Sequence, residues 1–379
     1  MRLLPVALLV LFPFLLGFGP PPSLIESDDA RTPVGRPELG GLTTGRPPLA
    51  IGEASLLMDL TTGGVPFQRN ARERVAPASL TKIMTAVIAL ERGRMDEEVT
   101  VAADDLVEGS AMGLRAGDRL TVEQLLWGML IPSGNDAAQT IARTIGGGSV
   151  PRFVEMMNNK ARALGMADTH FINPHGLDAE EHYSSAYDLA QLSRYAMRQP
   201  VFARIVASKD VIVEAASRTY YRRTTNQLLS LHELSDGVTG IKTGFTDKAG
   251  DCLIAAVERN GRQVLVVVMG ASDRAASAAS LIDYAYKQFA WVPAPAWLSG
   301  RTPVDPRFRT AAVMVPLWQA RMVQASMALP TEARPLPFAA PQALLTFSVG
   351  GREQGRMALY PPPDRAGPLA GRLVPQAAP

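Results

Sequence analysis

The chain has 379 residues, of which 47% are hydrophobic, so it can bury a sizeable core and its length suggests two domains. Its formal net charge is only +2, and no long basic run interleaves with aromatic residues, which argues against nucleic acid as a partner. Cys252 is the single cysteine, which excludes an intrachain disulfide, and no Cys/His cluster has metal-ligand spacing. We therefore expect neither a metal nor a cofactor.

The N-terminus has the pattern of an export signal. Arg2 precedes an apolar run over residues 3–18, and a Gly-Pro-Pro-Pro break follows at Gly19. The run is short for a transmembrane helix, and no small-x-small cleavage site follows it, so residues 1–20 are either a signal peptide or a retained anchor. We expect an exported protein of the periplasm or another extracytoplasmic part of the cell envelope, with possible membrane attachment through this segment.

Residues 21–50 are rich in Pro and Gly and predict a flexible linker, with order beginning near Ile51. The next segments combine strand and helix signals. Alternation around Thr61-Thr62-Gly63-Gly64 predicts a hairpin, helical spacing of apolar residues predicts a helix from Ser79 to Gly93, and Thr121 with Gln124 forms a capping-box pair before another helix.

Two further helices are expected, from Ser149 to Gly165 and from Ser185 to about Gln199. Beyond Gly240 the pattern changes to strands. Two apolar runs, 252–257 and 263–269, flank Asn260-Gly261, which is a type I′ turn signal, and residues 279–290 read as helix. Strands at both ends of a helical middle predict an α+β fold, with one antiparallel sheet built from both ends and helices packed on it.

The region after Trp291 is rich in Pro and short apolar runs. Residues 343–349 and 356–360 flank Gly350-Gly351 and resemble a hairpin. We therefore divide the chain into a main domain over 51–292, a small β-rich C-terminal domain over 293–360, and a disordered tail over 361–379, which holds six prolines.

Ser79 and Lys82 are the first candidates for chemistry. On a helix, residues three apart share a face, so the lysine amine can reach the serine hydroxyl and act as its base. The chain holds 38 basic residues, of which only six are Lys. Lysine can lose its proton when it is desolvated, whereas arginine cannot. In a chain that uses arginine for most of its basic residues, a lysine beside a serine is therefore better interpreted as a general base than as a surface charge. An exposed helical Ser and Lys is the alternative.

Ser133 and Asn135 lie in a break between two helical segments, after Pro132. The serine could relay a proton between the amine and a leaving group, and the asparagine amide could bind a substrate carbonyl and orient Lys82. Alternatively, both are turn residues that cap the next helix.

Lys242, Thr243 and Gly244 lie where the chain turns toward strands. The lysine and threonine can bind a carboxylate, and the glycine lets a ligand approach the strand backbone closely. The alternative is a surface lysine beside a glycine turn.

Ser-x-x-Lys, Ser-x-Asn and Lys-Thr-Gly in this order, about 54 and then 109 residues apart, form the signature of penicillin-recognising serine enzymes. The sequence around them closely resembles the D-alanyl-D-alanine carboxypeptidases, the low-molecular-mass penicillin-binding proteins, over roughly residues 50–290. The matching segments are 78–85, 112–117, 132–138, 173–177 and 240–246. The resemblance implies a β-lactamase/transpeptidase-like fold.

The resemblance also implies roles. Ser79 would be the acyl-ester nucleophile, Lys82 the proton acceptor and Ser133 the proton relay, whereas Asn135 and the three residues Lys242, Thr243 and Gly244 would bind substrate. Ser79 would attack the carbonyl between two terminal D-alanines of a peptidoglycan pentapeptide. The backbone N–H of Ser79 and one from the strand after Gly244 would form the oxyanion hole. Water would then release the shortened peptide. β-Lactams would trap Ser79. Unlike many relatives, the chain ends without a basic amphipathic helix.

Three alternatives stay open at this point: a class A-like β-lactamase, a D,D-endopeptidase and a non-catalytic wall-binding protein. The first normally has Ser-Asp-Asn and a Glu for deacylation, whereas this chain has Ser133-Gly134-Asn135 and no matching Glu motif that we can locate. A Ser-His-Asp triad is disfavoured because no Gly-x-Ser-x-Gly occurs, and His175 and Cys252 are interpreted as structural.

Overall fold

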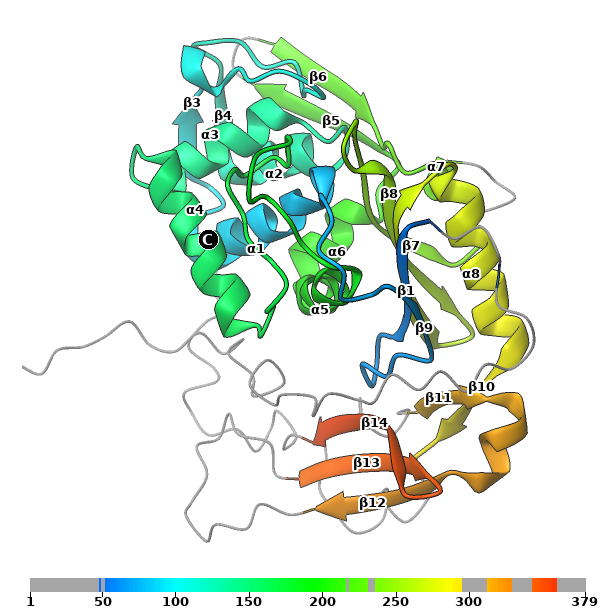
Figure 1. Cartoon of the computed structure of the whole chain (residues 1–379). Helices are drawn as coiled ribbons and strands as arrows, with labels where there is room; N and C mark the ends of the chain where they lie inside the picture. Colours follow the sequence, from blue (N-terminus) through cyan, green and yellow to red (C-terminus); the bar gives the residue numbers. More distant parts are fainter. Residues whose placement is uncertain are drawn as a thin grey trace, which may run out of the picture.

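The computed structural model describes residues 48, 52–215, 218–230, 236–294, 312–328 and 343–359. Its centre is a five-stranded antiparallel sheet with the strand order β2-β1-β9-β8-β7 (Figure 1). The sheet joins strands from both ends of the helical region, which confirms the predicted α+β arrangement. The strands are β1 (Ala54–Asp59), β2 (Phe67–Arg69), β7 (Val238–Thr246), β8 (Gly250–Arg259) and β9 (Arg262–Ala271).

Most helices lie between β2 and β7 in the sequence and form a cluster on one side of the sheet, while α8 covers the opposite face (Figure 1). In chain order the helices are η1 (Ala78–Thr81), α1 (Lys82–Arg92), η2 (Ala103–Asp105), α2 (Val122–Leu130), α3 (Asn135–Ile145), α4 (Val150–Ala163), α5 (Ala186–Met197), α6 (Pro200–Val206), α7 (Gln227–Ser230) and α8 (Arg274–Gln288). Two small hairpins accompany them: β3 (Glu98–Thr100) with β4 (Arg119–Thr121), and β5 (Asp210–Ala215) with β6 (Arg218–Arg223).

The helix starts predicted from capping residues are confirmed. Thr121 forms a reciprocal capping box with Gln124 at α2, and the Ser149 and Ser185 side chains cap α4 and α5. The last helix differs from its prediction, because α8 begins at Arg274 and not near residue 279. After Arg274 its first turns consist of Ala and Ser, which give no pattern of large apolar residues, and the Asp273 carboxylate caps the helix.

The sheet is buried on both faces, which explains the uninterrupted apolar runs in its central strands. Successive side chains of β9 alternate between two cores. Leu265, Val267 and Met269 pack with the helical cluster, whereas Val264, Val266 and Val268 pack against α8. Asn260 and Gly261, both at positive φ, turn β8 into β9 as the sequence predicts.

The C-terminal region contains a three-stranded antiparallel sheet of β12 (Gln324–Ala328), β13 (Ala343–Val349) and β14 (Arg352–Leu359). Strand β10 (Phe289–Pro293) follows α8 and pairs with β11 (Ala312–Pro316), and the 3-10 helix η4 (Leu317–Met322) leads into β12 (Figure 1). The small β sheet expected at this end is therefore present. The exact domain boundaries, at 292/293 and 360/361, stay predictions.

Residues 1–20 and 361–379 lie outside the described residues, as does the linker over 21–50 apart from Pro48. Among the helices that the structure does describe, none combines the length and the apolar character that crossing a membrane requires.

Candidate active site

Ser79 and Lys82 meet at the junction of η1 and α1. Ser79 is half-buried in the short 3-10 turn, and Lys82 is the first residue of the α-helix that follows. Ala78 holds a φ of 47°, a left-handed conformation that is uncommon for alanine and that reverses the chain just before the serine. The result is a hydrogen bond of 2.8 Å from Lys82 Nζ to Ser79 Oγ. The alternative of an exposed helical serine and lysine is therefore wrong, because Lys82 is buried and is hydrogen-bonded to Ser79.

The Lys82 amine is completely buried and has oxygen partners on three sides. It donates to Ser79 Oγ at 2.8 Å, to Asn135 Oδ1 at 2.7 Å and to the backbone carbonyl of His175 at 2.7 Å. Burial lowers the pKa of Lys82 well below its ordinary value, and the charge of Lys242 lowers it further, whereas Asp136 opposes the shift. Both dominant effects favour the neutral amine, which is the form that can accept a proton.

Ser133 and Asn135 lie between α2 and α3, and both are buried. Ser133 adopts a φ of 66°, and the N-cap residue of α3 is Gly134, so neither Ser133 nor Asn135 caps this helix and the helix-capping alternative is wrong. The Asn135 amide instead bridges two elements: its oxygen accepts from Lys82, and its nitrogen donates to the Glu108 carbonyl at 2.6 Å. Asn135 thus holds the amine and the neighbouring loop together.

Asp136 is a supporting residue that the sequence analysis did not single out. Its carboxylate accepts backbone hydrogen bonds of 2.8 to 2.9 Å from Met112, Gly113 and Leu114. The side chain is buried, and its charge is the one that partly opposes the lowered pKa of Lys82. The only sequence signal for Asp136 was its position next to Asn135 in the segment 132–138. Its hydrogen-bond partners lie 22 to 24 residues earlier in the chain, so the sequence alone did not indicate them.

Lys242, Thr243 and Gly244 lie on β7, which runs alongside the nucleophile turn. A Cβ built on Gly244 would lie 3.1 Å from the backbone nitrogen of Ser79 and 3.0 Å from the Ala78 side chain. The glycine therefore allows the strand backbone to pass beside Ser79 at close range. This arrangement places the Lys-Thr-Gly segment at the same site as Ser79 and Lys82, although more than 150 residues separate the two in sequence.

The two side chains before Gly244 are both buried. Lys242 Nζ donates to the carbonyl of Thr243 at 2.9 Å, so it is not the surface lysine of the alternative interpretation. Burial lowers the pKa of Lys242 to about 7, and the nearby charge of Arg274 contributes. Arg274 in turn donates to the Gly244 carbonyl and to Asp251 Oδ1, both at 3.1 Å, so it supports this strand from α8.

The segment 173–177 closes the site beside the nucleophile turn. Asn173 accepts from Gly176 N at 2.6 Å and donates to the Leu177 carbonyl at 2.8 Å, which forms a tight turn. Gly176 has a φ of 93°, and a Cβ there would lie 1.9 Å from the Ala78 carbonyl oxygen, so only glycine fits. The His175 side chain is buried, and burial and the charge of Lys82 lower its pKa to about 3, so it is neutral. The role of His175 toward Lys82 rests on its backbone carbonyl.

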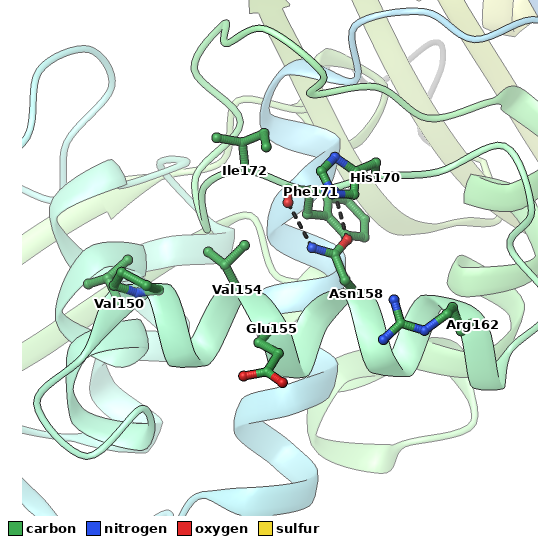
Figure 2. A pocket seen from close by; sticks show the side chains of 9 residues that line it. Val150, Val154, Glu155, Asn158, Arg162, His170, Phe171 and Ile172 are labelled. Carbon is green, nitrogen blue, oxygen red and sulfur yellow. Dashed lines mark hydrogen bonds between the residues drawn. The ribbon is translucent and has the colours of Figure 1, made fainter.

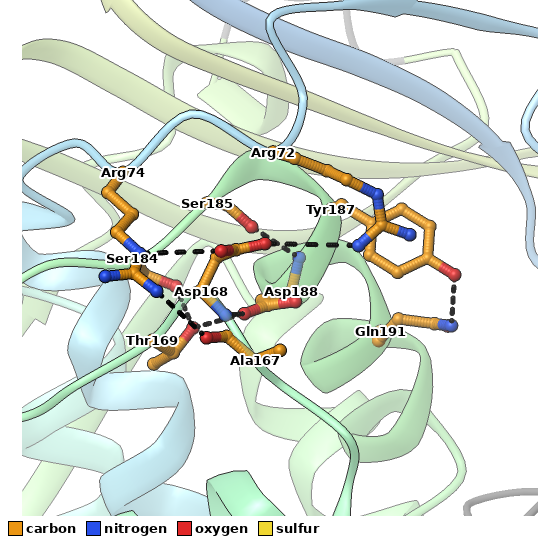
Figure 3. Close-up of polar contacts among 10 residues, drawn as sticks. All are labelled: Arg72, Arg74, Ala167, Asp168, Thr169, Ser184, Ser185, Tyr187, Asp188 and Gln191. Atoms are coloured by element: carbon orange, nitrogen blue, oxygen red, sulfur yellow. Dashed lines mark hydrogen bonds and ion pairs between the residues drawn. The ribbon is translucent and has the colours of Figure 1, made fainter. Parts of the chain in front are cut away.

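A network of charged and polar groups fixes the chain that leads into Ser79 (Figure 3). Arg74 donates to Asp168 Oδ1 at 3.4 Å, and the Arg72 guanidinium lies over the Tyr187 ring, 4.0 Å from its centroid. Asp188 at the start of α5 accepts from the backbone nitrogen of Asp168 at 2.8 Å. Segment 71–75 is thereby tied to α5 and to the loop before residue 170.

A surface groove of about 450 Å³ lies between α4 and residues 170–172, which directly precede the segment 173–177 in the chain (Figure 2). Its wall includes Asn158, whose side chain both donates to the Phe171 carbonyl and accepts from the Phe171 nitrogen, each at 2.9 Å. None of the seven candidate residues lines this groove. It is therefore separate from the site around Ser79, although Asn158 anchors the chain that leads to His175.

The structure thus brings together Ser79, Lys82, Asn135, Lys242 and Gly244, with Ser133 and Thr243 on the same two segments. A serine next to a buried, deprotonatable amine can carry out acyl transfer, and a buried lysine with a neighbouring hydroxyl can hold a carboxylate. Across the residues described, no group of three or more His, Cys, Asp or Glu side chains is placed to hold a metal ion.

Comparison with known proteins gives a consistent family. A family model described as D-alanyl-D-alanine carboxypeptidase matches residues 43–273. The D-alanyl-D-alanine carboxypeptidase DacF of Bacillus subtilis is 35% identical over 247 residues, which are 62% of each chain. DacD of Salmonella typhimurium is 38% identical over 266 residues, 65% of this chain and 66% of the relative. The chain thus spans slightly less than two thirds of these relatives.

The chain is also similar to solved structures, one of which covers more of it. Penicillin binding protein 6B from Escherichia coli is similar with a TM-score of 0.66 and 31% identity, and the match covers 84% of this chain and 98% of that one. The Streptomyces K15 DD-transpeptidase matches with a TM-score of 0.60 and 30% identity over 63% of this chain and 98% of its own. The longer match extends beyond the five-stranded sheet, in agreement with the α+β fold followed by a small β sheet.

Proposed function

Because this chain belongs to the D-alanyl-D-alanine carboxypeptidase family, we propose that it is a serine-type D-Ala-D-Ala carboxypeptidase that removes the terminal D-alanine from peptidoglycan pentapeptides. One observation carries the proposal: Lys82 Nζ, fully buried and with a lowered pKa, lies 2.8 Å from Ser79 Oγ. We further propose that the protein acts on the extracytoplasmic side of the cell envelope and that β-lactams inhibit it.

In the acylation step, neutral Lys82 takes the proton of Ser79 Oγ as that oxygen attacks the carbonyl carbon between the two D-alanines. The C–N bond breaks, D-alanine leaves as an amine, and an acyl-ester remains on Ser79. Ser133 relays the proton to the leaving nitrogen. Water then attacks the ester with the same base, which releases the shortened peptide and restores Ser79.

Substrate binding in this proposal uses the two flanking segments. Asn135 binds a substrate amide while it orients Lys82, since its side-chain oxygen already accepts from that amine at 2.7 Å. Lys242 and Thr243 bind the terminal carboxylate. The close approach of Gly244 to Ser79 N supports an oxyanion hole from that N–H and one donor of the strand beyond Gly244. Removing one such donor typically costs about 3 kcal/mol of transition-state stabilisation.

The test uses the full chain, a fluorescent penicillin and a pentapeptide that ends in D-Ala-D-Ala. We expect a long-lived penicillin adduct by intact mass, with peptide mapping that places it on Ser79, and release of D-alanine from the peptide. Ser79→Ala should lose both. Absence of any penicillin labelling would favour the non-catalytic wall-binding alternative, and rapid turnover of penicillin would favour the β-lactamase.

A cross-linked peptide dimer is the matched second substrate, because an endopeptidase would cleave it and a strict carboxypeptidase would not. D-alanine release that persists in Ser79→Ala would show that the nucleophile is assigned to the wrong residue.

A further inference from the structure

Thr225 lies beside the proposed carboxylate site, although it belongs to none of the three motifs. It follows β6 and precedes α7, and its Oγ1 lies 2.5 Å from Thr243 Oγ1. Its backbone nitrogen donates to the Ile131 carbonyl at 3.2 Å, two residues before Ser133. Thr225 thus connects the Ser133–Asn135 segment with β7 across the site.

We propose that Thr225 is a positioning residue that fixes the Thr243 hydroxyl for a substrate carboxylate and thereby makes the site prefer a free carboxylate over an uncharged end. This inference rests on the proposed function and deepens it. It concerns the part of the site that selects the substrate terminus, and it assigns no contact between Thr225 and the reacting atoms.

The chain around Thr225 is held firmly enough for such a role. The Thr224 backbone nitrogen donates to the Lys209 carbonyl at 2.7 Å, and Thr224 Oγ1 accepts from the Asn226 nitrogen at 3.1 Å. Asn226 is buried, and its Oδ1 accepts from the Leu228 nitrogen at 3.1 Å. Bonds on both sides therefore fix the backbone from which the Thr225 hydroxyl projects.

The chemistry follows from what a hydroxyl can do. Each threonine hydroxyl has one proton to donate and two lone pairs to accept with. When Thr225 donates to Thr243 Oγ1, the Thr243 proton is left for an outside acceptor. Lys242 Nζ donates to the Thr243 carbonyl at 2.9 Å, and this hydrogen bond fixes the backbone of Thr243 as well. A carboxylate oxygen is the acceptor that such a hydroxyl beside a lysine favours, because hydrogen bonds to charged groups are the stronger ones.

The experiment compares two peptides that differ only at the end: one terminates in D-Ala-D-Ala with a free carboxylate, the other in the corresponding D-alaninamide. For wild type, Thr225→Val and Thr225→Ser, kcat/KM is measured on both. We expect Thr225→Val to lose about 10-fold on the carboxylate peptide, mainly through KM, and to change little on the amide. Thr225→Ser keeps the hydroxyl and should restore the preference for the acid.

Thr219→Val is the matched control, because it removes the hydroxyl of an exposed threonine on β6, the strand that precedes Thr225. It should leave the ratio of acid to amide rates unchanged. An unchanged ratio in Thr225→Val, or an equal loss on both peptides, would overturn the inference. Thr225→Ala replaces Thr225→Val if circular dichroism shows that the latter is misfolded.

The two proposals fail separately. A wild-type protein that releases no D-alanine contradicts the proposed function, whereas an active wild type with an unchanged ratio in the variant contradicts only the role of Thr225. If the wild type is inactive, the role of Thr225 can still be tested by calorimetry. The Kd values of the same two peptides are then measured for Ser79→Ala and for Ser79→Ala/Thr225→Val. A Kd for the acid that is equal in both proteins would then overturn the inference.

Discussion

The backbone carbonyl oxygen of His175 lies 2.7 Å from Lys82 Nζ and gives the buried amine its third oxygen partner, beside Ser79 Oγ and Asn135 Oδ1. An ammonium has three protons to donate, so all three partners are satisfied when Lys82 is charged. A neutral amine keeps two protons and gains a lone pair. With His175 and Asn135 still accepting, that lone pair faces Ser79, which is the geometry a general base needs.

Replacing Lys82 with Arg should abolish acylation, because a guanidinium stays protonated at every accessible pH and cannot accept the Ser79 proton. We expect the rate of labelling by a fluorescent penicillin to fall by about 100-fold or more, which is the usual contribution of a general base. Lys160→Arg is the control, since Lys160 pairs with Glu91, which lies at the opposite end of α1 from Lys82. A Lys82→Arg protein that labels within 10-fold of wild type would show that another group is the base.

The pH dependence of catalysis should reveal two lysines with opposite requirements. Acylation needs Lys82 neutral, so kcat/KM should rise as the pH rises through its lowered pKa. Carboxylate binding needs Lys242 charged, and its pKa is about 7 in the free protein, so kcat/KM should fall above about pH 7. Lys242→Arg keeps the charge at high pH and should lose the alkaline limb. An identical limb in that variant would contradict the assignment.

The same lowered pKa has a consequence for stability. Between about pH 7 and 10.5, folded Lys242 is neutral whereas the unfolded chain still binds the proton. The unfolded state therefore binds more protons, and the contribution of this group to the free energy of unfolding increases with pH across that window. Below about pH 7 both states are charged and the penalty is constant. Lys242→Met should lack this slope in urea unfolding curves measured from pH 7 to 10.

The parts of the fold that local signals encode were predictable from the sequence. The caps at Thr121, Ser149 and Ser185 act within their own first turn, and Asn260-Gly261 fixes a two-residue hairpin by its own conformational preference. The hairpin β5–β6 was not predicted, since its second strand reads Arg-Thr-Tyr-Tyr-Arg-Arg, in which only Tyr220 is buried, and therefore lacks an alternating apolar pattern.

The candidate site shows the same division. Ser79 and Lys82 are three residues apart, so a helix alone brings them together. The roles of the His175 carbonyl and of Thr225 could not be predicted, because every residue has a carbonyl and because Thr225 meets Thr243 only when β7 packs beside the turn after β6. His175 was interpreted as structural, and its imidazole is indeed neutral and buried, but its backbone contacts the amine directly.

Gly176→Ala should impair acylation through a steric effect. The new Cβ would lie 1.9 Å from the Ala78 carbonyl oxygen, so either the nucleophile turn or the segment 173–177 must move, and the His175 carbonyl moves with it. We expect penicillin labelling to fall by about 10-fold or more, since small displacements of reacting groups have large effects on rate. Gly117→Ala has nearly the same φ, 91°, and nothing within 4 Å, so it should label within about threefold of wild type. Equal losses in both variants would indicate backbone strain alone.

Asp59→Ala should destabilise the protein without affecting the site. Asp59 is buried at the end of β1, where it accepts from Thr61 and Thr62 and, at 3.0 Å, from the backbone nitrogen of Met314 on β11. The variant leaves these N–H groups without their acceptor, and one buried orphan donor costs about 1 to 3 kcal/mol. Penicillin labelling of folded protein should stay near wild type. Asp283→Ala, at an exposed pair with Lys287, is the control and should change stability by less than about 0.5 kcal/mol.

The destabilisation by Asp59→Ala should itself depend on pH. Burial raises the pKa of Asp59 from 3.8 to about 6, against the opposing effect of its backbone hydrogen bonds. Between those two values the folded state binds more protons than the unfolded state, so the stability that this carboxyl group contributes decreases as the pH rises. The alanine variant lacks the group. The difference in unfolding free energy between wild type and variant should therefore be larger at pH 4.5 than at pH 7, and the opposite order in urea unfolding curves would show that the folded carboxyl group is ionised throughout.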